Sequence, residues 1–269
     1  MNTRFWRSVR TALAAIVVIA TSSPSQAERI TVAGTGAATV FLRRIGTEFT
    51  MRTGVEVEIL PGVGSSGALR ALGDGVLDIA VSGRPLTPEE IARGMTVAIS
   101  LRTPFVFATS LSNRQRMSVA ELVEAYDSGN KMWPEGERIR VILRPKQESA
   151  TTFMEGTFPG LAAALAAARR RPDVPLAATD QDNATLAENT PGSLVGITYL
   201  QAVTEHRNLR FVVLDGVEPT MENFDRGVYP YALPLDFVTS ARQRPAVDRF
   251  LDFMRSEQGE SIFRHAHIY

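Results

Sequence analysis

The sequence contains no cysteine in its 269 residues. This absence excludes disulfide bonds, thiolate metal sites and cysteine nucleophiles together. Histidine is almost as scarce, and two of its three occurrences form the pair His265-x-His267 close to the end of the chain. A terminal pair of this kind is typical of an exposed tail rather than of a metal site, and no His-Glu-x-x-His motif occurs. We therefore expect neither a metal nor another cofactor.

The motifs of common enzyme classes are missing as well. Gly34-Thr-Gly36 is not a dinucleotide-binding fingerprint, because Thr39 stands where a third glycine or alanine is needed. No Walker A pattern occurs, and Gly64-Ser-Ser-Gly67 differs from the nucleophile elbow of hydrolases. A hydrolase would still need Ser65 or Ser149 beside a histidine or lysine. The sequence thus favours a binding protein over an enzyme.

Net charge is also lacking, since 29 basic and 29 acidic residues balance each other. A chain this close to neutrality has no general attraction for nucleic acid or for an anionic membrane surface, so we expect neither as a partner. Any site for an anion must therefore come from local geometry.

Residues 1–27 have the three parts of a secretory signal peptide. Three arginines form a positive region, Thr11–Ala20 is apolar, and Ser25-Gln-Ala27 offers small residues for cleavage. An uncleaved membrane anchor is the alternative, but the apolar run is about half of the ~20 residues that a span needs. We therefore expect export to the periplasm and a mature chain that starts near residue 28. Cleavage would remove three basic residues and no acidic ones, which leaves a net charge of −3.

Strand-like and helix-like runs alternate along the rest of the chain. Val40–Arg52 has apolar residues at helical spacing, and Gly54 follows it as a stop signal. Thr87-Pro-Glu-Glu-Ile91 has an N-cap threonine, a proline at the first helical position and acid in the first turn, which predicts a helix start. Such alternation indicates an α/β fold with a mostly parallel, covered sheet. Strands are predicted at 29–32, 55–60 and 77–81, and further helices at 66–73 and 161–171.

Two of these strands end in glycine-rich turns that lead into helices. The first turn is Gly34-Thr-Gly36, and the second is Pro61-Gly-Val-Gly-Ser-Ser-Gly67. Turns of this kind leave backbone N–H groups unpaired at a helix N-terminus, where the helix dipole favours an anion. The repeated pattern predicts a protein that holds an anion without covalent chemistry.

The order and spacing of these segments resemble those of the periplasmic phosphate-binding proteins of ABC transporters, within the type II solute-binding proteins. The resemblance covers nearly all of the mature chain and is strongest at Gly64–Gly67, Asp78–Pro88 and Phe250–Gly259. It implies a two-lobed α/β periplasmic binding protein of type II topology, with its ligand in the cleft between the lobes.

Two extended segments marked by prolines, 101–110 and 229–240, resemble the crossover hinge segments that join the lobes in this family. On that basis residues 28–103 and 234–269 form lobe one, and residues 104–233 form lobe two. The alternative is that the two segments are ordinary strands of one sheet.

The resemblance assigns the lobe-one half of the ligand site to the two glycine-rich turns. Thr35 and Gly36 align with the family's first phosphate-contacting turn, and Ser65 and Ser66 lie at the second helix start. Hydroxyl and backbone N–H groups at these places can donate to one oxyanion. An ordinary N-cap is the alternative role for the two serines.

In lobe two the resemblance implies an arginine followed by a Ser-Gly-Thr turn. Arg144 keeps the arginine, whose guanidinium matches two oxygens of a tetrahedral anion, and Ser149 and Thr151 keep the hydroxyls. Ala150 replaces the glycine, and Lys146 stands where relatives often have an acid. These two changes depart from the family, and a surface arginine in a salt bridge is the alternative for Arg144.

A further departure concerns the proton of the ligand. Several phosphate binders have an aspartate at the position of Gly83, which accepts the proton of phosphate and repels fully ionised sulfate. Gly83 has no side chain to do this, so either another residue accepts the proton or the ligand is a different oxyanion. Glu148, Asp180 and Asp182 are the candidate acceptors, although helix capping is the simpler role for the two aspartates.

Together these features predict a periplasmic solute-binding protein that captures a small oxyanion, phosphate first, for an ABC importer. Its partner would be the membrane permease, and we expect a monomer. The alternative is a sensory or regulatory module of the same fold that has lost tight phosphate binding and signals to a membrane sensor. Gly83 and Ala150 point towards that alternative.

Overall fold

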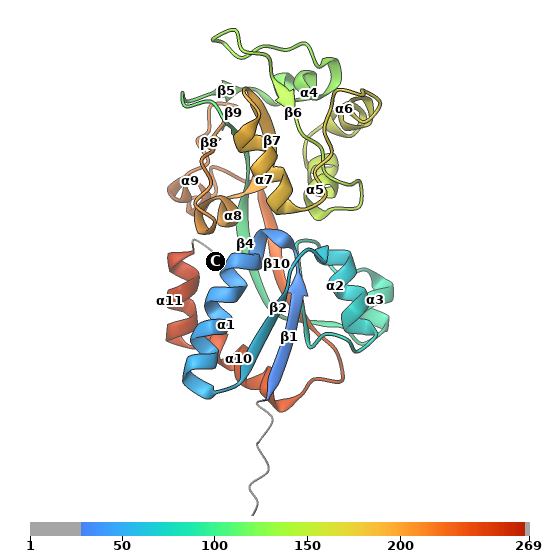
Figure 1. Cartoon of the computed structure of the whole chain (residues 1–269), viewed down its shortest axis with the longest axis vertical. Helices are drawn as coiled ribbons and strands as arrows, with labels where there is room; N and C mark the ends of the chain where they lie inside the picture. Colours follow the sequence, from blue (N-terminus) through green and yellow to red (C-terminus); the bar gives the residue numbers. More distant parts are fainter. Residues whose placement is uncertain (1–27, 267–269) are drawn as a thin grey trace, which may run out of the picture.

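The computed structural model describes residues 28–266, and the predicted signal peptide at 1–27 lies outside the described residues. Figure 1 shows two α/β lobes, one above the other, joined by the strands β4 (Thr96–Thr109) and β10 (Ala232–Thr239). This arrangement confirms the predicted two-lobed α/β fold. Within residues 28–266 no helix is both long enough and apolar enough to cross a membrane.

The sheet of lobe one has a parallel core. β1 (Arg29–Gly34) lies between β2 (Glu56–Leu60) and β3 (Ile79–Ser82) and pairs with both in parallel. β3 is buried along its whole length, and β1 is buried over its last three residues. Burial of this kind is typical of parallel strands that are covered by helices on both faces. The ends of each strand lie within two residues of those predicted.

β4 carries the chain from lobe one into lobe two. Up to Pro104 it pairs with β10 in antiparallel register, and from Phe105 it pairs with β7 (Ser193–Thr198). The segments 101–110 and 229–240 therefore join the lobes and are also neighbouring strands of one sheet, so both interpretations of them hold. The lobe boundaries themselves stay a prediction, and the change of partner along β4 falls beside the first of them.

Helices cover the lobe-one sheet on both faces, as Figure 1 shows. One face is covered by α1 (Thr39–Thr53), α10 (Pro245–Arg255) and α11 (Glu257–His265), and the other by α2 (Gly64–Gly73) with α3 (Pro88–Ala92) beside it. A short 3-10 helix, η1 (Gly36–Ala38), links β1 to α1. The larger core contains the edge-to-face pair Phe49 and Phe250, whose ring centroids are 5.1 Å apart. Aromatic pairs in this geometry add to the stability that burial provides.

Local signals in the sequence explain where several helices begin and end. α1 stops at Gly54, which adopts a left-handed conformation with φ of 74°, as its stop signal predicts. α3 begins with the predicted cap, since Thr87 and Glu90 form a complete capping box around Pro88. The predicted helix at 161–171 ends early, at Ala168, because the turn that follows leads into a proline at position 172.

Lobe two is built around a second aromatic core. Trp133 is buried there, and its indole N–H donates to the Gly192 carbonyl at 3.0 Å. Phe105 and Phe107 of β4 pack in the same core, so the connecting strand is anchored in this lobe. The helices are α4 (Val119–Ser128), α5 (Ser149–Thr157), α6 (Leu161–Ala168), α7 (Asp180–Asn189), α8 (Tyr199–Thr204) and α9 (Met221–Asp225). The short strands are β5 (Arg116–Met117), β6 (Arg140–Val141), β8 (Arg210–Phe211) and β9 (Val213–Leu214).

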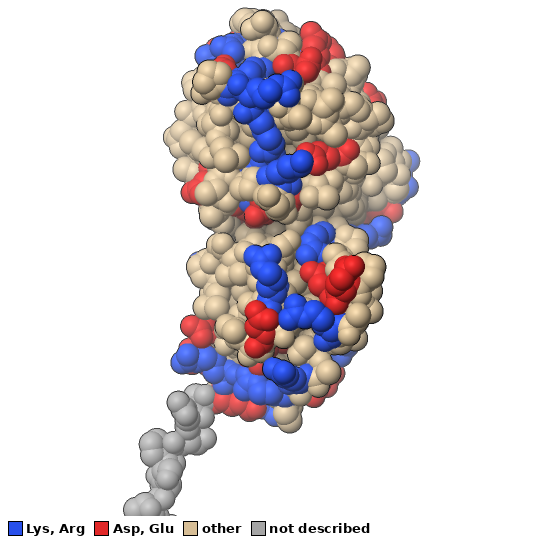
Figure 2. Space-filling view, turned by 90° about the vertical axis from the view of Figure 1, so that its right-hand side faces the viewer, with Lys and Arg blue, Asp and Glu red and all other residues tan. Residues whose placement is uncertain are grey.

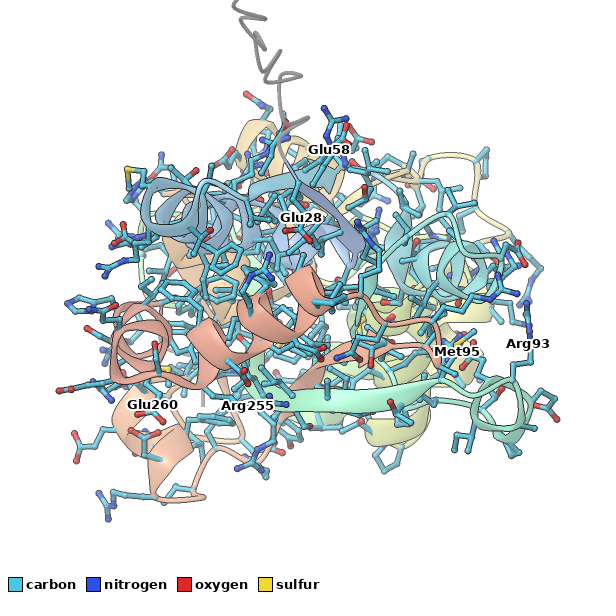
Figure 3. The ribbon with its side chains drawn as sticks, turned by 90° about the horizontal axis from the view of Figure 1, so that it is seen from below. Glu28, Glu58, Arg93, Met95, Arg255 and Glu260 are labelled. Atoms are coloured by element: carbon cyan, nitrogen blue, oxygen red, sulfur yellow. The ribbon has the colours of Figure 1, made fainter. Side chains whose placement is uncertain are left out.

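Polar side chains contact one another at the end of lobe one that is farthest from lobe two. Figure 3 shows this end from below. Glu28, the residue before β1, forms an ion pair with Arg249 of α10. Arg255, also on α10, donates to the Ala98 carbonyl of β4 at 2.9 Å. Because these side chains are about half exposed, such contacts contribute little to stability. The buried packing of α10 therefore holds the lobe together.

A tight contact at the end of β1 fixes the strands that lead to the cleft. A Cβ on Gly34 would lie 2.0 Å from the Val81 carbonyl oxygen of β3. We expect Gly34→Ala to force β1 and β3 apart and to lower the free energy of unfolding by about 1–3 kcal/mol or more. Gly156→Ala is the control, because a Cβ at Gly156 in α5 meets nothing within 4 Å and alanine favours the helix. Urea unfolding of both variants tests this, and equal effects would contradict it.

Candidate functional site

A small cavity lies between the lobes, where helix starts from both lobes meet. Its volume is about 20 Å³, which is room for roughly one water molecule. It is lined by Gly36, Gly62 and Gly64 of lobe one and by Arg144, Glu148, Ala178, Thr179 and Asp180 of lobe two. Two of the predicted site residues, Gly36 and Arg144, therefore share one cavity.

Three helices that begin beside this cavity lack a side-chain cap. Thr35, Val63 and Glu148 hold the N-cap positions of η1, α2 and α5, and none of their side chains accepts a hydrogen bond from the helix start. α3, α4 and α7 each have a serine or threonine cap with a complete capping box, whereas α6 and α10 are uncapped like the first three. Uncapped starts leave backbone N–H groups that an anion can use.

Ser65 and Ser66 do not cap α2, because the helix already begins at Gly64 and both serines lie inside its first turn. The N-cap alternative for them is therefore wrong. The Ser65 hydroxyl accepts hydrogen bonds from the Gly83 backbone N–H and from the Ser149 hydroxyl, each at 2.9 Å. Since Ser149 is the first residue of α5, this contact joins the two lobes directly.

Gly83 permits this approach because it has no side chain. A Cβ at this position would lie 3.3 Å from the Ser149 Cβ and 3.6 Å from the Ser65 hydroxyl oxygen. An aspartate here, as in several phosphate binders, would occupy the space in which the two serines meet. The absence of an acid at position 83 therefore allows the direct contact between the lobes.

Arg144 is buried, with 4% of its side chain exposed, so it is not a surface arginine, although it does form the ion pairs that the alternative expected. Its Nη1 donates to the Ala177 carbonyl at 3.0 Å, and its Nη2 lies 3.3 Å from one carboxylate oxygen each of Glu148 and Asp180. The Nε atom has no partner among residues 28–266. A buried guanidinium with an unused donor suits the oxygens of an oxyanion.

The two acids beside Arg144 have raised pKa values. Burial raises the pKa of Glu148, while Arg144 opposes the rise and the nearby Asp180 adds to it. Burial also raises the pKa of Asp180, against the effects of Arg144 and of the backbone N–H groups of Ala37 and Gly36. Both acids therefore hold a proton more readily than an exposed carboxylic acid does.

The structure separates the roles of the two aspartates in α7. Asp182 forms the capping box with Thr179: its carboxylate accepts from the Thr179 backbone N–H, and its own backbone N–H donates to the Thr179 hydroxyl, each at 3.0 Å. Asp180, the first residue of α7, takes no part in that cap and lines the cavity. The capping interpretation is therefore right for Asp182 and wrong for Asp180. The Thr-x-x-Asp pattern was the signal that could have separated them.

The other predicted residues, Ser65 and Ser149 included, are not among the residues that line the cavity. The backbone N–H of Thr35 donates to the Val81 carbonyl at 2.9 Å within lobe one. The Ser66 hydroxyl accepts from the Nε of Arg84 at 3.3 Å, also within lobe one. Thr151 is fully buried, and its hydroxyl has no partner in the described part of the chain. Ser65, Ser149, Gly36 and Arg144 are thus the predicted residues that the closed cleft brings together.

Sequence reasoning missed Gln181 and Glu205. The Gln181 amide donates to the Gly36 carbonyl at 2.9 Å and to the Glu205 carboxylate at 2.7 Å, so it links the lobes a second time. Arg207 holds Glu205 from its other side. No local pattern marks these residues, because α7 and α8 meet η1 only in the folded chain.

A larger cavity, of about 350 Å³, lies elsewhere on lobe two. Figure 2 shows Lys and Arg side chains gathered in a band along this lobe, and Arg138 and Arg140 line the cavity. These two side chains are 44% and 42% exposed and form ion pairs with Asp173 and Glu137. Arg171 also lines this cavity, and its Nε is buried without a partner among residues 28–266. The cleft differs in that Arg144 is buried as a whole, whereas Arg171 is only partly buried.

The contact between Ser65 and Gly83 yields a stability prediction. Ser65→Ala removes the acceptor of a buried backbone N–H, so we expect it to lower the free energy of unfolding by about 1–3 kcal/mol. Ser66→Ala is the matched control, since Arg84 keeps its ion pair with Glu90 when the second hydroxyl is lost. Urea unfolding measures both variants, and a larger loss for Ser66→Ala would contradict the assignment.

The raised pKa of Glu148 yields a pH prediction. A carboxylic acid whose pKa is higher in the folded state than in the unfolded chain stabilises the fold at low pH, and that stability is lost as the pH rises through the folded-state pKa. We therefore expect Glu148→Gln to raise the melting temperature at neutral pH, with the gain vanishing below about pH 4. Thermal unfolding between pH 4 and 8 tests this. Glu137→Gln is the exposed control and should stay within about 0.5 kcal/mol of the parent.

Solved structures share this fold at low sequence identity. A candidate phosphate ABC transporter substrate-binding protein with bound phosphate from Clostridium perfringens is 18% identical, with a TM-score of 0.77, and the match covers 90% of this chain and 98% of that one. An ABC-type phosphate transport receptor from Vibrio cholerae is 15% identical, with a TM-score of 0.64 and coverage of 88% and 98%. The periplasmic molybdate-binding protein of Azotobacter vinelandii is 13% identical, with a TM-score of 0.63 and coverage of 89% and 98%.

At these identities the likeness shows the fold, and each of the three is named as a binding protein or a receptor. No curated protein matches the sequence. The family model described as PBP superfamily domain matches residues 20–258, which is most of the chain. The protein therefore belongs to the periplasmic binding protein (PBP) superfamily.

Proposed function

We propose that this protein captures a small tetrahedral oxyanion, phosphate first, in the cleft between its lobes and delivers it to the membrane permease of an ABC importer. The observation that carries this proposal is the buried Arg144, whose Nε is unpartnered beside the uncapped starts of η1, α2 and α5. Phosphate stands first because two of the structures with this fold are named as phosphate proteins.

The donors of the proposed site come from both lobes. Arg144 supplies a charged fork, and Ser65 and Ser149 supply hydroxyls at the first turns of α2 and α5. In this arrangement of the lobes the two hydroxyls bond to each other. An oxyanion therefore binds between them only after the lobes move apart. Parting of the lobes is a hinge motion along β4 and β10, the two strands that connect them.

Glu148 is the residue that we propose as acceptor of the ligand's proton in place of the aspartate missing at Gly83. It lies 3.3 Å from Arg144, and its Oε1 is 3.2 Å from where a Cβ on Gly64 would be. A carboxylate at this point accepts from a protonated oxyanion and repels one that has no proton. The site should therefore prefer hydrogenphosphate and arsenate to sulfate.

We also propose a location, an oligomeric state and lobe boundaries for the protein. We place the mature protein in the periplasm, as a monomer, with lobe one at residues 28–103 and 234–269 and lobe two at 104–233. We propose a binding protein rather than an enzyme, since within residues 28–266 neither Ser65 nor Ser149 bonds to a histidine or lysine. The sensory alternative is not favoured, because the matches reported above are binding proteins and receptors of transport.

A thermal-shift panel on the mature protein tests the ligand class. Bound ligand is first removed by unfolding and refolding, and phosphate, arsenate, sulfate and molybdate are then compared at matched ionic strength. We expect stabilisation by phosphate and arsenate that grows with concentration, as linkage requires. Absence of any shift with all four oxyanions would contradict the proposal.

Arg144→Ala tests the residue that carries the proposal. Loss of a buried charged donor should weaken phosphate binding by about 2–4 kcal/mol in calorimetry. Arg144→Lys keeps the charge but not the planar fork, so its effect should be intermediate. Arg140→Ala, which removes an exposed and ion-paired arginine of the same lobe, is the control and should bind as the parent does. Unchanged affinity in Arg144→Ala would remove Arg144 from the site.

A further inference from the structure

Asp180 reaches across the cleft into the glycine-rich turn of lobe one. It opens α7 in lobe two, yet a Cβ placed on Gly36 of lobe one would lie 2.6 Å from its Oδ2 atom. A side chain at position 36 would therefore force the carboxylate to shift. Its side chain is 15% exposed, so the contact is largely shielded from solvent.

The partners of Asp180 are the donors that an oxyanion needs. Its Oδ1 lies 3.3 Å from the Nη2 of Arg144, and the backbone N–H groups of Ala37 and Gly36 interact with its carboxylate. A carboxylate is itself a small oxyanion with two oxygens. Asp180 thus uses the guanidinium and the uncapped start of η1 in the way that an external anion would.

The size of the cavity decides whether both anions fit together. It has about 20 Å³ between Gly36, Arg144, Glu148 and Asp180, which is about the space of one water molecule. A tetrahedral oxyanion has five heavy atoms and does not fit beside the Asp180 carboxylate in this arrangement. Binding of one therefore excludes the other from the same donors.

We propose that Asp180 is an internal ligand of the cleft, which holds the lobes together in this arrangement and must be displaced before an external oxyanion binds. This inference rests on the proposed function and adds a residue that sets the affinity of that site. Two further bonds between the lobes, from Ser149 to Ser65 and from Gln181 to Gly36, belong to the same closed arrangement.

The charges around Asp180 make this competition depend on pH. Arg144 faces it with a positive charge, while Glu148 and Glu205 face it with negative charges, and Arg207 neutralises part of the second. Burial raises the pKa of Asp180, so lowering the pH towards that value protonates it in the closed cleft. A neutral carboxylic acid releases the guanidinium, and the external anion then competes against a weaker partner.

The experiment compares the parent with Asp180→Asn and Asp180→Ala, using the mature chain freed of bound ligand and inorganic phosphate as the probe. Both substitutions remove the competing charge, and alanine also empties its space. We expect each variant to bind phosphate about tenfold more tightly than the parent at neutral pH in calorimetry. Asp182→Asn, two residues further on in the capping box, is the matched control and should bind as the parent does.

The pH dependence gives a second readout. The ratio of the parent's dissociation constant to that of Asp180→Asn cancels the titration of phosphate itself. We expect this ratio to fall towards one as the pH is lowered from 8 to 5. Weaker or unchanged phosphate binding in both Asp180 variants would overturn the inference. Weaker binding would mean that Asp180 assists the ligand, and unchanged binding that it plays no part.

Small-angle scattering of the ligand-free proteins separates this inference from the proposed function. Asp180→Ala should have a larger radius of gyration than the parent, because the closed arrangement loses its internal ligand. If no variant binds any oxyanion, the proposed function fails, and a larger radius for Asp180→Ala still supports Asp180 as the group that holds the cleft closed. An unchanged radius in that case overturns the inference as well.

Discussion

The antiparallel pairing of β4 with β10 is the constraint on which the rest of the structure depends. Both strands pass between the lobes, and β4 exchanges one partner for another between Pro104 and Phe105. The sheet therefore continues from one lobe into the other, and the lobes can move only by bending this pair of strands. Every contact across the cleft, including that between Ser65 and Ser149, can therefore form only in the lobe orientations that the β4–β10 pair permits.

The chemistry of the cleft follows from burying charges at that junction. Arg144 lies between two carboxylates, and all three are mostly shielded from water. Burial of a cation is costly unless nearby groups compensate its charge, and Glu148, Asp180 and the Ala177 carbonyl do so here. The same groups leave Nε without a partner. A receptor for anions needs such a cation, and the acids that make its burial tolerable also limit which anions reach it.

Much of the fold could be predicted from the sequence because its signals are local. The stop at Gly54, the capping box at Thr87 and the strand ends near the glycine-rich turns depend on neighbouring residues alone. The site was harder, since its geometry depends on residues far apart in the chain. Ser65 was predicted beside a ligand or as a cap, but its partners Gly83 and Ser149 come from other elements. No local sequence pattern predicts the approach of α7 to η1.

Gly83 has a consequence for how the specificity of this protein can change. Its missing side chain leaves the space into which Ser149 fits, with Ser65 on the far side. An acid introduced at position 83 would therefore meet the serine from the opposite lobe before it met any ligand. The two positions are coupled across the cleft, and substitutions there should be strongly non-additive. Any route by which evolution or design gives this cleft a second acidic specificity group must alter both lobes together.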